Sequence, residues 1–234
     1  MTRVTKDKET SKIILVAATG MEVKLLTNDC ETIHAYSDHL KTYRLGKNNF
    51  DILLSGIGLT FTTFSLTHTL LSHSYALVIN AGIAGTLSEQ LKIGDVVCVV
   101  EEEFGDLGIE SEAGFLTLFD SGFLHPDEFP FENRMLKADG AEIAGFLPKV
   151  RGITTNISHG RDSTINEIKN QFSASVESME GAAVFYVCRY LGVPCVQIRA
   201  ISNRVAPREN AGWNIPLALE NLKDRLERIL TEHS

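Results

Sequence analysis

The sequence lacks the features that would assign it to a membrane, secreted or nucleic-acid-binding class. Its 234 residues carry a net charge of −8 without a basic stripe, which makes nucleic acid and anionic lipid poor partners. The apolar run after the charged N-terminus, IILVAA, is too short for a membrane span or a signal peptide. With 44% hydrophobic and 22% charged residues, the composition predicts one globular domain, expected in the cytoplasm.

Cysteine and histidine are scarce, and neither is spaced for metal binding. None of the four cysteines forms a CxxC pair, so we expect reduced, buried thiols rather than disulfides or metal ligands. The seven histidines include no HxxxH or HExxH motif. We therefore expect neither a metal nor a cofactor.

Common nucleotide-binding and hydrolase motifs are missing as well. The sequence has no GxSxG elbow. The glycine-rich stretches SGIG (55–58) and NAGIAG (80–85) match neither GxGxxG with a later acidic residue nor GxxxxGK[ST]. Taken singly, each stretch is equally well explained as a tight turn between a strand and a helix.

What is present is an alternation of short apolar runs and helical patterns. Most of the runs lack a polar/apolar alternation, as expected for strands covered on both faces. The predicted strands span 12–18, 50–56, 75–82, 95–100, 150–155 and 194–201. The predicted helices span 60–72, 132–145, 182–192 and 215–230, the last with an apolar stripe of Leu219, Leu222, Leu226 and Ile229.

This order of elements predicts an α/β fold. We expect a single domain over residues 12–234, with a central mixed β-sheet flanked by helices, and a flexible tail over residues 1–11. In such sheets ligands bind beyond the carboxyl ends of the strands. Three of these ends are glycine-rich and others carry carboxylates or an amide, so the pattern predicts a small-molecule pocket.

Three polar groups near the strand ends are candidates for chemistry. Glu22, at the start of a predicted helix, is by position alone more simply a dipole-complementing acid than a general base. Glu180 lies in the apolar segment SMEGAAV and could bind the vicinal hydroxyls of a ribose, or could equally be solvent-exposed. The cluster SHGRD (158–162) is more simply a polar loop than a catalytic group.

Taken together, the segments resemble the nucleoside phosphorylase/nucleosidase superfamily. The matching stretches follow the order of that family and cover most of the chain from residue 12 to residue 232. They are GMEVKLL (20–26), SGIG (55–58), VINAGIAGTL (78–87), LKIGDVV (91–97), SMEGAAV (178–184) and LGVPCVQIRAISN (191–203). The resemblance implies a nucleoside phosphorylase-like fold, a nucleoside substrate and a homo-oligomer, either a dimer or larger.

Within the superfamily the first loop is similar to that of the methylthioadenosine/adenosylhomocysteine nucleosidases. The resemblance implies that Glu22 activates the attacking water. Phosphorylases instead present arginines to hold phosphate, and the loop AATGME offers none. Arg161 stays open as a phosphate ligand.

The resemblance also implies the residues that bind the nucleoside. Met179 and Glu180 would contact the ribose, and Ile57 would face the substituent on the sugar. The remaining pocket residues that it implies are Gly82 and Gly85 in the glycine-rich loop, and Thr164 or Ile165 against the base. Two positions depart from the family, Ile83 in place of a usual serine and Glu177, which is displaced by one place, so neither is given a role.

Asn203 departs from the adenine-specific nucleosidases, which carry an aspartate there that protonates N7 of adenine. An asparagine amide offers a donor and an acceptor instead. Its NH2 can donate to O6 of a 6-oxopurine while its carbonyl accepts from a protonated N7. Adenine would oppose donor to donor, and an unmade buried hydrogen bond costs about 1–3 kcal/mol. We therefore predict an oxopurine leaving group, with Asn203 as a catalytic residue beside Glu22.

A nucleosidase that releases hypoxanthine resembles the futalosine hydrolases of menaquinone biosynthesis. The stretches RAISNRVAPRENAGWNIPLAL (199–219) and EFGDLGIE (103–110) are similar to that family. The benzoate of futalosine would need a cation or an aromatic partner, for which the candidates are Arg204, Arg208, Trp213 and Phe104. The rival readings are a phosphate-dependent nucleoside phosphorylase, a methylthioadenosine-type nucleosidase and a non-catalytic nucleoside-binding protein.

Overall fold

The computed structural model describes residues 12–112 and 114–232. The flexible tail predicted for residues 1–11 lies outside the described residues. Within the described part, no helix has the length and apolar character needed to cross a membrane.

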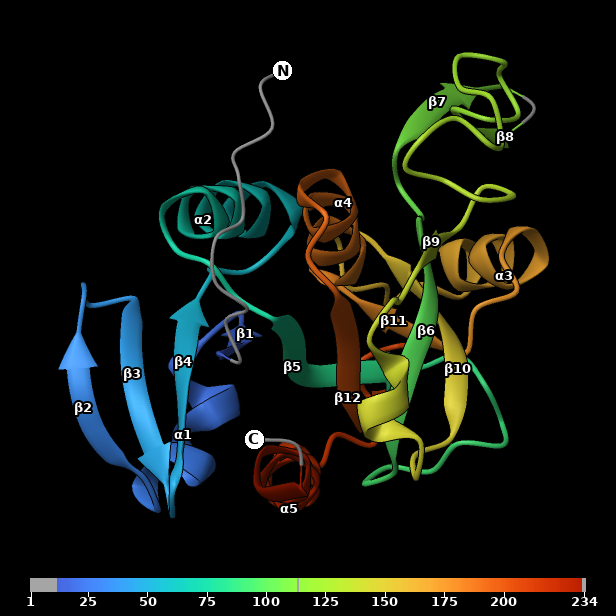
Figure 1. Cartoon of the computed structure of the whole chain (residues 1–234). Helices are drawn as coiled ribbons and strands as arrows, with labels where there is room; N and C mark the ends of the chain where they lie inside the picture. The colour runs from blue at the N-terminus through green and yellow to red at the C-terminus, as the bar shows by residue number, and fades with distance from the viewer. Residues whose placement is uncertain (1–11, 113, 233–234) are drawn as a thin grey trace.

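The core of the fold is one mixed sheet (Figure 1), which confirms the predicted α/β class. The central strands are buried, and every residue of β1 is buried. The edge strand β2 is exposed throughout and largely polar. In spatial order the strands are β11 (Val176–Ser178), β10 (Lys149–Thr154), β6 (Val96–Phe104), β12 (Cys195–Arg204), β5 (Leu77–Thr86), β1 (Ile13–Ala17), β4 (Asn48–Leu54), β3 (Leu40–Leu45) and β2 (Glu31–Ala35), with β9 (Leu136–Lys137) beside β6.

One additional pairing bends this sheet on itself. β11 pairs with β10 on one side and, antiparallel, with β5 on the other. The strands β11, β10, β6, β12 and β5 therefore form a closed ring. β12 runs parallel to β5 and antiparallel to β6, with a register shift between Ile201 and Asn203. The shift lies where β12 passes the end of β5.

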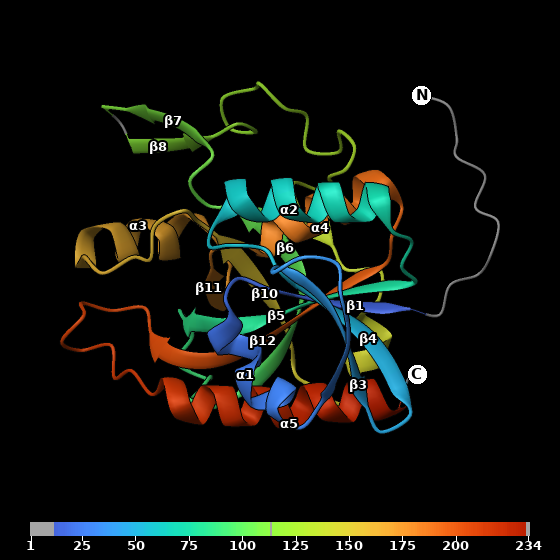
Figure 2. The same ribbon diagram turned by 90° about the vertical axis from the view of Figure 1, so that its left-hand side faces the viewer.

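Helices cover the sheet from two sides, as Figure 2 shows. α1 (Gly20–Asn28) and α5 (Ile215–Glu232) pack together on one side, and their buried side chains join those of β1 and β5 in one core cluster. α2 (Leu59–Ser72) and α4 (Gly181–Leu191) pack together on the opposite side. α3 (Asp162–Gln171) lies beside the ring of strands, over a smaller cluster that contains Ile153 and Ile168.

The strongest periodic patterns are confirmed. α4 ends at Leu191, and Gly192 adopts the left-handed conformation, φ 67°, that a helix C-cap favours. The predicted stripe of α5 is buried: Leu219 is 9% exposed, and Leu222, Leu226 and Ile229 are fully buried. All six predicted strands are present, with ends that differ by a few residues.

The predicted helix over 132–145 is wrong. Asn133 and Arg134 have positive φ values, 49° and 71°, which an α-helix cannot contain. Leu136 and Lys137 form β9 against β6, and only Ala141–Ala144 makes one 3-10 turn, between Gly140 and Gly145. The apolar periodicity of this segment reflects an irregular chain packed on the sheet: Leu136, Ala141, Ala144 and Leu147 are all buried. The preceding segment contains the small sheet of β7 (Gly108–Ser111) and β8 (Gly114–Thr117).

Candidate active site

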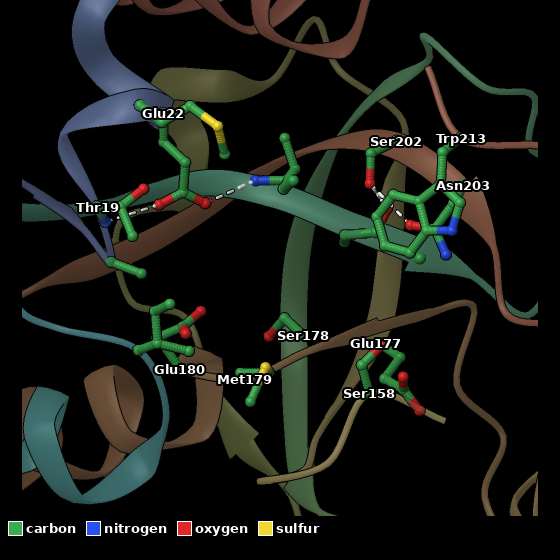
Figure 3. A pocket seen from close by; sticks show the side chains of 16 residues that line it. Thr19, Glu22, Ser158, Glu177, Ser178, Met179, Glu180, Ser202, Asn203 and Trp213 are labelled. Carbon is green, nitrogen blue, oxygen red and sulfur yellow. Dashed lines mark hydrogen bonds between the residues drawn. The ribbon is translucent and has the colours of Figure 1, made fainter. Parts of the chain in front are cut away.

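A cavity of about 210 Å³ opens at the carboxyl ends of β1, β5 and β12, where α/β folds usually bind ligands. Figure 3 shows its side chains: Glu22 lies at one end and Asn203 with Trp213 at the other. Of the residues expected to act on or bind the substrate, seven line it, namely Glu22, Ile57, Gly85, Met179, Glu180, Asn203 and Trp213.

Glu22 both caps a helix and faces the cavity. Its Oε2 accepts a hydrogen bond from Thr19 N at 3.1 Å, and its Oε1 accepts one from Ile83 N at 3.1 Å. The side chain is thus fixed by two backbone donors, and the residue is only 8% exposed. Burial raises the pKa of Glu22, against the opposing effect of the Arg199 guanidinium, and the nearby Glu180 carboxylate raises it further. A carboxyl group with a raised pKa is suited to general-base catalysis near neutral pH.

Glu180 is buried, which excludes the alternative that it is a solvent-exposed residue. It stands at the N-cap of α4, where Oε1 accepts from Gly58 N at 3.0 Å and Oε2 lies 3.3 Å from Arg199 Nη2. Gly58 belongs to the SGIG stretch and has φ 90°, a conformation that favours glycine. The stretch therefore supplies a backbone donor to Glu180 at the cavity.

Arg199 is a functional candidate that the sequence analysis does not single out. It is 1% exposed, and its Nη2 also donates to Gln197 Oε1 at 3.2 Å. An added Cβ on Gly82 would collide with Arg199 Nη1 and with Glu22 Oε1, so a side chain there would displace at least one of them. The buried guanidinium therefore lies between the two carboxylates and offsets their repulsion. A signal was available, since an arginine inside a buried strand needs an anionic partner.

Asn203 closes the other end of the cavity. It is 5% exposed, its Oδ1 accepts from Ser202 Oγ at 2.8 Å, and its Nδ2 donates to Arg204 O at 2.9 Å. A primary amide has two N–H groups and two lone pairs, so one of each remains for a ligand.

Glu177 and His159, to which the sequence analysis assigns no role, contact each other at this same end of the cavity. Glu177 lines the cavity, and its carboxylate lies 2.6 Å from His159 Nδ1. His159 lines an adjoining cavity of about 510 Å³, which shares Ser158, Asn203 and Trp213 with the first. The pair could not be found from spacing, because the two residues lie 18 positions apart on different elements.

The remaining candidates lie outside the main cavity. Thr164 and Arg208 line the adjoining cavity, as does Arg161. Four others, of which Gly82 in β5 is one, line neither cavity. Ile165 packs in the core cluster under α3, Phe104 packs its ring against Phe131 and Tyr186, and Arg204 is exposed with its backbone N–H bonded to Ala211 O. Within the described residues, no cluster of side chains is arranged to bind a metal ion.

The family model of the phosphorylase superfamily matches residues 12–231. The chain belongs to the phosphorylase superfamily. Among curated members it is 32% identical to a futalosine hydrolase of Streptomyces coelicolor, over 78% of this chain and 79% of that protein. A futalosine hydrolase of Acidothermus cellulolyticus is also 32% identical, over 74% of this chain and 72% of the relative.

Solved members of the phosphorylase superfamily share the fold. The native futalosine hydrolase of Helicobacter pylori strain 26695 superposes with a TM-score of 0.75 at 21% identity, covering 94% of this chain and 97% of that one. The 5′-methylthioadenosine/S-adenosylhomocysteine nucleosidase of Helicobacter pylori superposes with a TM-score of 0.76 at 20% identity, covering 94% and 98%. Structure alone thus places the chain equally near both kinds of nucleosidase.

Proposed function

We propose that this member of the phosphorylase superfamily hydrolyses the N-glycosidic bond of futalosine, releasing hypoxanthine and dehypoxanthine futalosine for menaquinone synthesis. One observation supports the proposal above all. The buried carboxylate of Glu22, held by two backbone hydrogen bonds, lies at one end of a cavity, and the amide of Asn203 lies at the other end. The curated relatives named futalosine hydrolase support this choice of substrate.

The proposed reaction begins with cleavage of the bond between the sugar and the purine, through an oxocarbenium-like state. Glu180 holds the ribose hydroxyls close to the developing positive charge, and Met179 packs against the sugar. Glu22 then removes a proton from the water that attacks the anomeric carbon. The two backbone bonds to Glu22 favour this role, because they hold the carboxylate in place before substrate binds.

The purine is proposed to be bound by Asn203. Its free N–H donates to O6, and its carbonyl oxygen accepts from a protonated N7, a pattern that adenine does not match. Of the four candidate partners for the benzoate of futalosine, Trp213 and Arg208 line the cavities at the purine end and Arg204 and Phe104 line neither cavity, so none is assigned to the benzoate, which lies across the ribose from the purine.

Phosphate is a poor fit at the sugar end. Two carboxylates lie there, and Arg199, which lies beside them, is already paired with Glu180. An incoming phosphate would meet repulsion from both carboxylates. Arg161 lines the adjoining cavity rather than this one, so water is the favoured nucleophile.

The decisive experiment measures base release from futalosine, inosine and methylthioadenosine, with and without phosphate, by chromatography. We expect hypoxanthine from futalosine at a rate that phosphate does not change. Phosphate-dependent release would identify a phosphorylase, and preferred release of adenine would identify a methylthioadenosine-type nucleosidase. Binding of futalosine without turnover would identify a non-catalytic nucleoside-binding protein.

We also propose that the chain assembles as a homo-oligomer, and that the outer face of α2 takes part. Phe61, Phe64 and Leu71 on this face are 64%, 73% and 71% exposed, and contiguous exposed apolar side chains are typical of interfaces. Light scattering should give at least a dimer, and the double variant Phe64→Ser, Leu71→Ser should shift the mass toward the monomer. A wild-type monomer at micromolar concentration would contradict this proposal.

A further inference from the structure

Glu177 and Asn203 lie on either side of one glycine. Gly85 in β5 pairs with Glu177 of β11 and with Asn203 of β12. A Cβ added to Gly85 would lie 3.2 Å from Asn203 Nδ2 and 2.8 Å from Val205 Cγ2, so a side chain there would crowd the amide. The closed ring of strands thus brings a carboxylate and an amide to the same end of the cavity.

Glu177 fixes His159 at this end by two bonds. One carboxylate oxygen accepts from the backbone N–H of His159 at 3.1 Å, and the other lies 2.6 Å from its Nδ1. An ionised carboxylate can only accept, so Nδ1 must carry the proton that joins them. The same arrangement orients the catalytic histidine of serine proteases. Among the described residues, Nε2 of His159 has no hydrogen-bond partner.

The His159 imidazole, which carries the free Nε2, lines the cavity that adjoins the purine end of the main cavity. His159 lines the adjoining cavity together with Ser158, Asn203 and Trp213, the three residues that also line the main cavity. Glu177 on β11 contacts the imidazole, and the charged side chains that line the cavity with His159 are Arg161 on the same loop and Arg208 on the loop after β12. His159 and the amide that is proposed to bind the oxopurine therefore line the same cavity.

The proposed reaction leaves one proton unassigned. When the bond between C1′ and N9 breaks, its electron pair passes to the purine, which leaves most readily if a ring nitrogen gains a proton. The amide of Asn203 can stabilise the departing base but has no acidic proton to give. Histidine is the side chain that ordinarily gains and loses a proton between pH 5 and 8.

We propose that His159, oriented by Glu177, is the general acid that protonates the departing oxopurine at N7. This inference rests on the proposed function. The Nε2 proton passes to N7 as the C1′–N9 bond breaks, and the new N7–H is held by Asn203 Oδ1. Water forms the new bond to C1′ and loses its proton to Glu22. Charge balances, because His159 becomes neutral as Glu22 becomes neutral, and solvent restores both.

The test is His159→Gln, assayed by release of hypoxanthine from futalosine across the pH range. A glutamine can still bond to Glu177 but cannot deliver a proton. We expect kcat to fall about 100-fold, the low end for a general acid, with KM within threefold and the basic limb of the pH profile lost. His125→Gln replaces an exposed histidine on another loop and should leave both limbs unchanged.

A second variant covers the case in which His159→Gln does not fold, as judged by circular dichroism. Glu177→Gln keeps an oxygen near the loop but frees the tautomer of His159, and we expect about a tenfold fall in kcat with little change in KM. Wild-type kcat and an intact basic limb in the folded variants would overturn the inference. If the wild-type protein releases no hypoxanthine from futalosine, the proposed function itself is wrong, which is a distinguishable result.

Discussion

The two ends of the cavity differ in the forces that position their side chains. At the sugar end, Glu22 and Glu180 are buried beside the buried guanidinium of Arg199, and backbone N–H groups hold both carboxylates. At the purine end, the amide of Asn203 bonds to Ser202 and to the backbone of Arg204, its neighbours in sequence.

This difference matches the two tasks of the proposed reaction. Negative charge is concentrated where the sugar would become positive, and such preorganised charge is usually the largest contribution to catalysis. A neutral amide lies where the enzyme must discriminate between purine bases. A pattern of hydrogen-bond donors and acceptors discriminates between such bases more strongly than a charge does. Substitutions of the two carboxylates at the sugar end should therefore reduce the rate, and substitution of the Asn203 amide should change the preference between bases.

The largest effect is expected at the sugar end. Glu22→Gln and Glu180→Gln each keep the shape of the side chain but remove its charge, and each should reduce kcat on futalosine at least about 100-fold. Glu89→Gln, at an exposed position, is the matched control. Near-wild-type turnover in both cavity variants would refute the scheme.

The pH dependence should report the state of Glu22. A general base works when it is deprotonated, and burial raises the pKa of Glu22 above the 4.5 of an ordinary glutamate. Activity should therefore fall on the acid side at a pH above 4.5. A profile of kcat/KM against pH for futalosine measures this limb. If the rate held constant down to pH 4.5, Glu22 would not be the titrating base.

At the purine end, Asn203→Asp should shift preference from futalosine to methylthioadenosine. The aspartate can protonate N7 of adenine, while the loss of the donor to O6 should cost about 1–3 kcal/mol, or 5-fold to 150-fold in kcat/KM on futalosine. The ratio of kcat/KM for the two substrates measures the shift. A ratio unchanged from wild type would contradict the O6 argument.

The smallest effect on catalysis is expected outside the cavity, at Glu102. This fully buried carboxylate accepts from Gln197 Nε2 at 2.6 Å and from Thr154 Oγ1 at 2.9 Å, and burial raises its pKa to about 7. Because this pKa exceeds that of an unfolded glutamate, the folded state binds more protons between pH 4.5 and 7. The free energy of unfolding should therefore fall as pH rises through this range.

Glu102→Gln should remove that decline. Relative to wild type, the variant should gain up to about 3 kcal/mol in unfolding free energy between pH 5 and pH 8. Urea unfolding of both proteins at the two pH values measures the difference, and other titrating groups cancel. Parallel stability curves would show that Glu102 does not titrate in the folded state.

Hydrophobic periodicity predicted the elements whose side chains are buried in a regular pattern along the chain. The buried strands and the apolar stripe of α5 were readable because burial there repeats at the period of the element. The segment 132–145 was misread because an irregular chain can bury apolar side chains at similar intervals. β2 and β3 escaped detection because β2 is exposed throughout at the edge of the sheet and β3, which is only partly buried, is mostly polar.

The site was predictable only at residues whose local sequence marks them, such as a polar side chain directly beside an apolar run. Glu22, Glu180 and Asn203 stand next to apolar runs, and all three line the cavity. Arg199, His159 and Glu177 gain their partners from other elements, because the ring of strands brings them together. Such pairings depend on topology rather than on local sequence, so spacing alone could not reveal them.

β5 sets the spacing between the groups at the two ends of the cavity. Gly82 abuts Glu22, and Gly85 abuts Asn203 three residues later, a rise of about 10 Å along a strand. The span between the two ends is therefore set by backbone geometry rather than by the length of any side chain. A side chain added at either glycine would therefore displace one of the two groups that the reaction needs at a fixed separation.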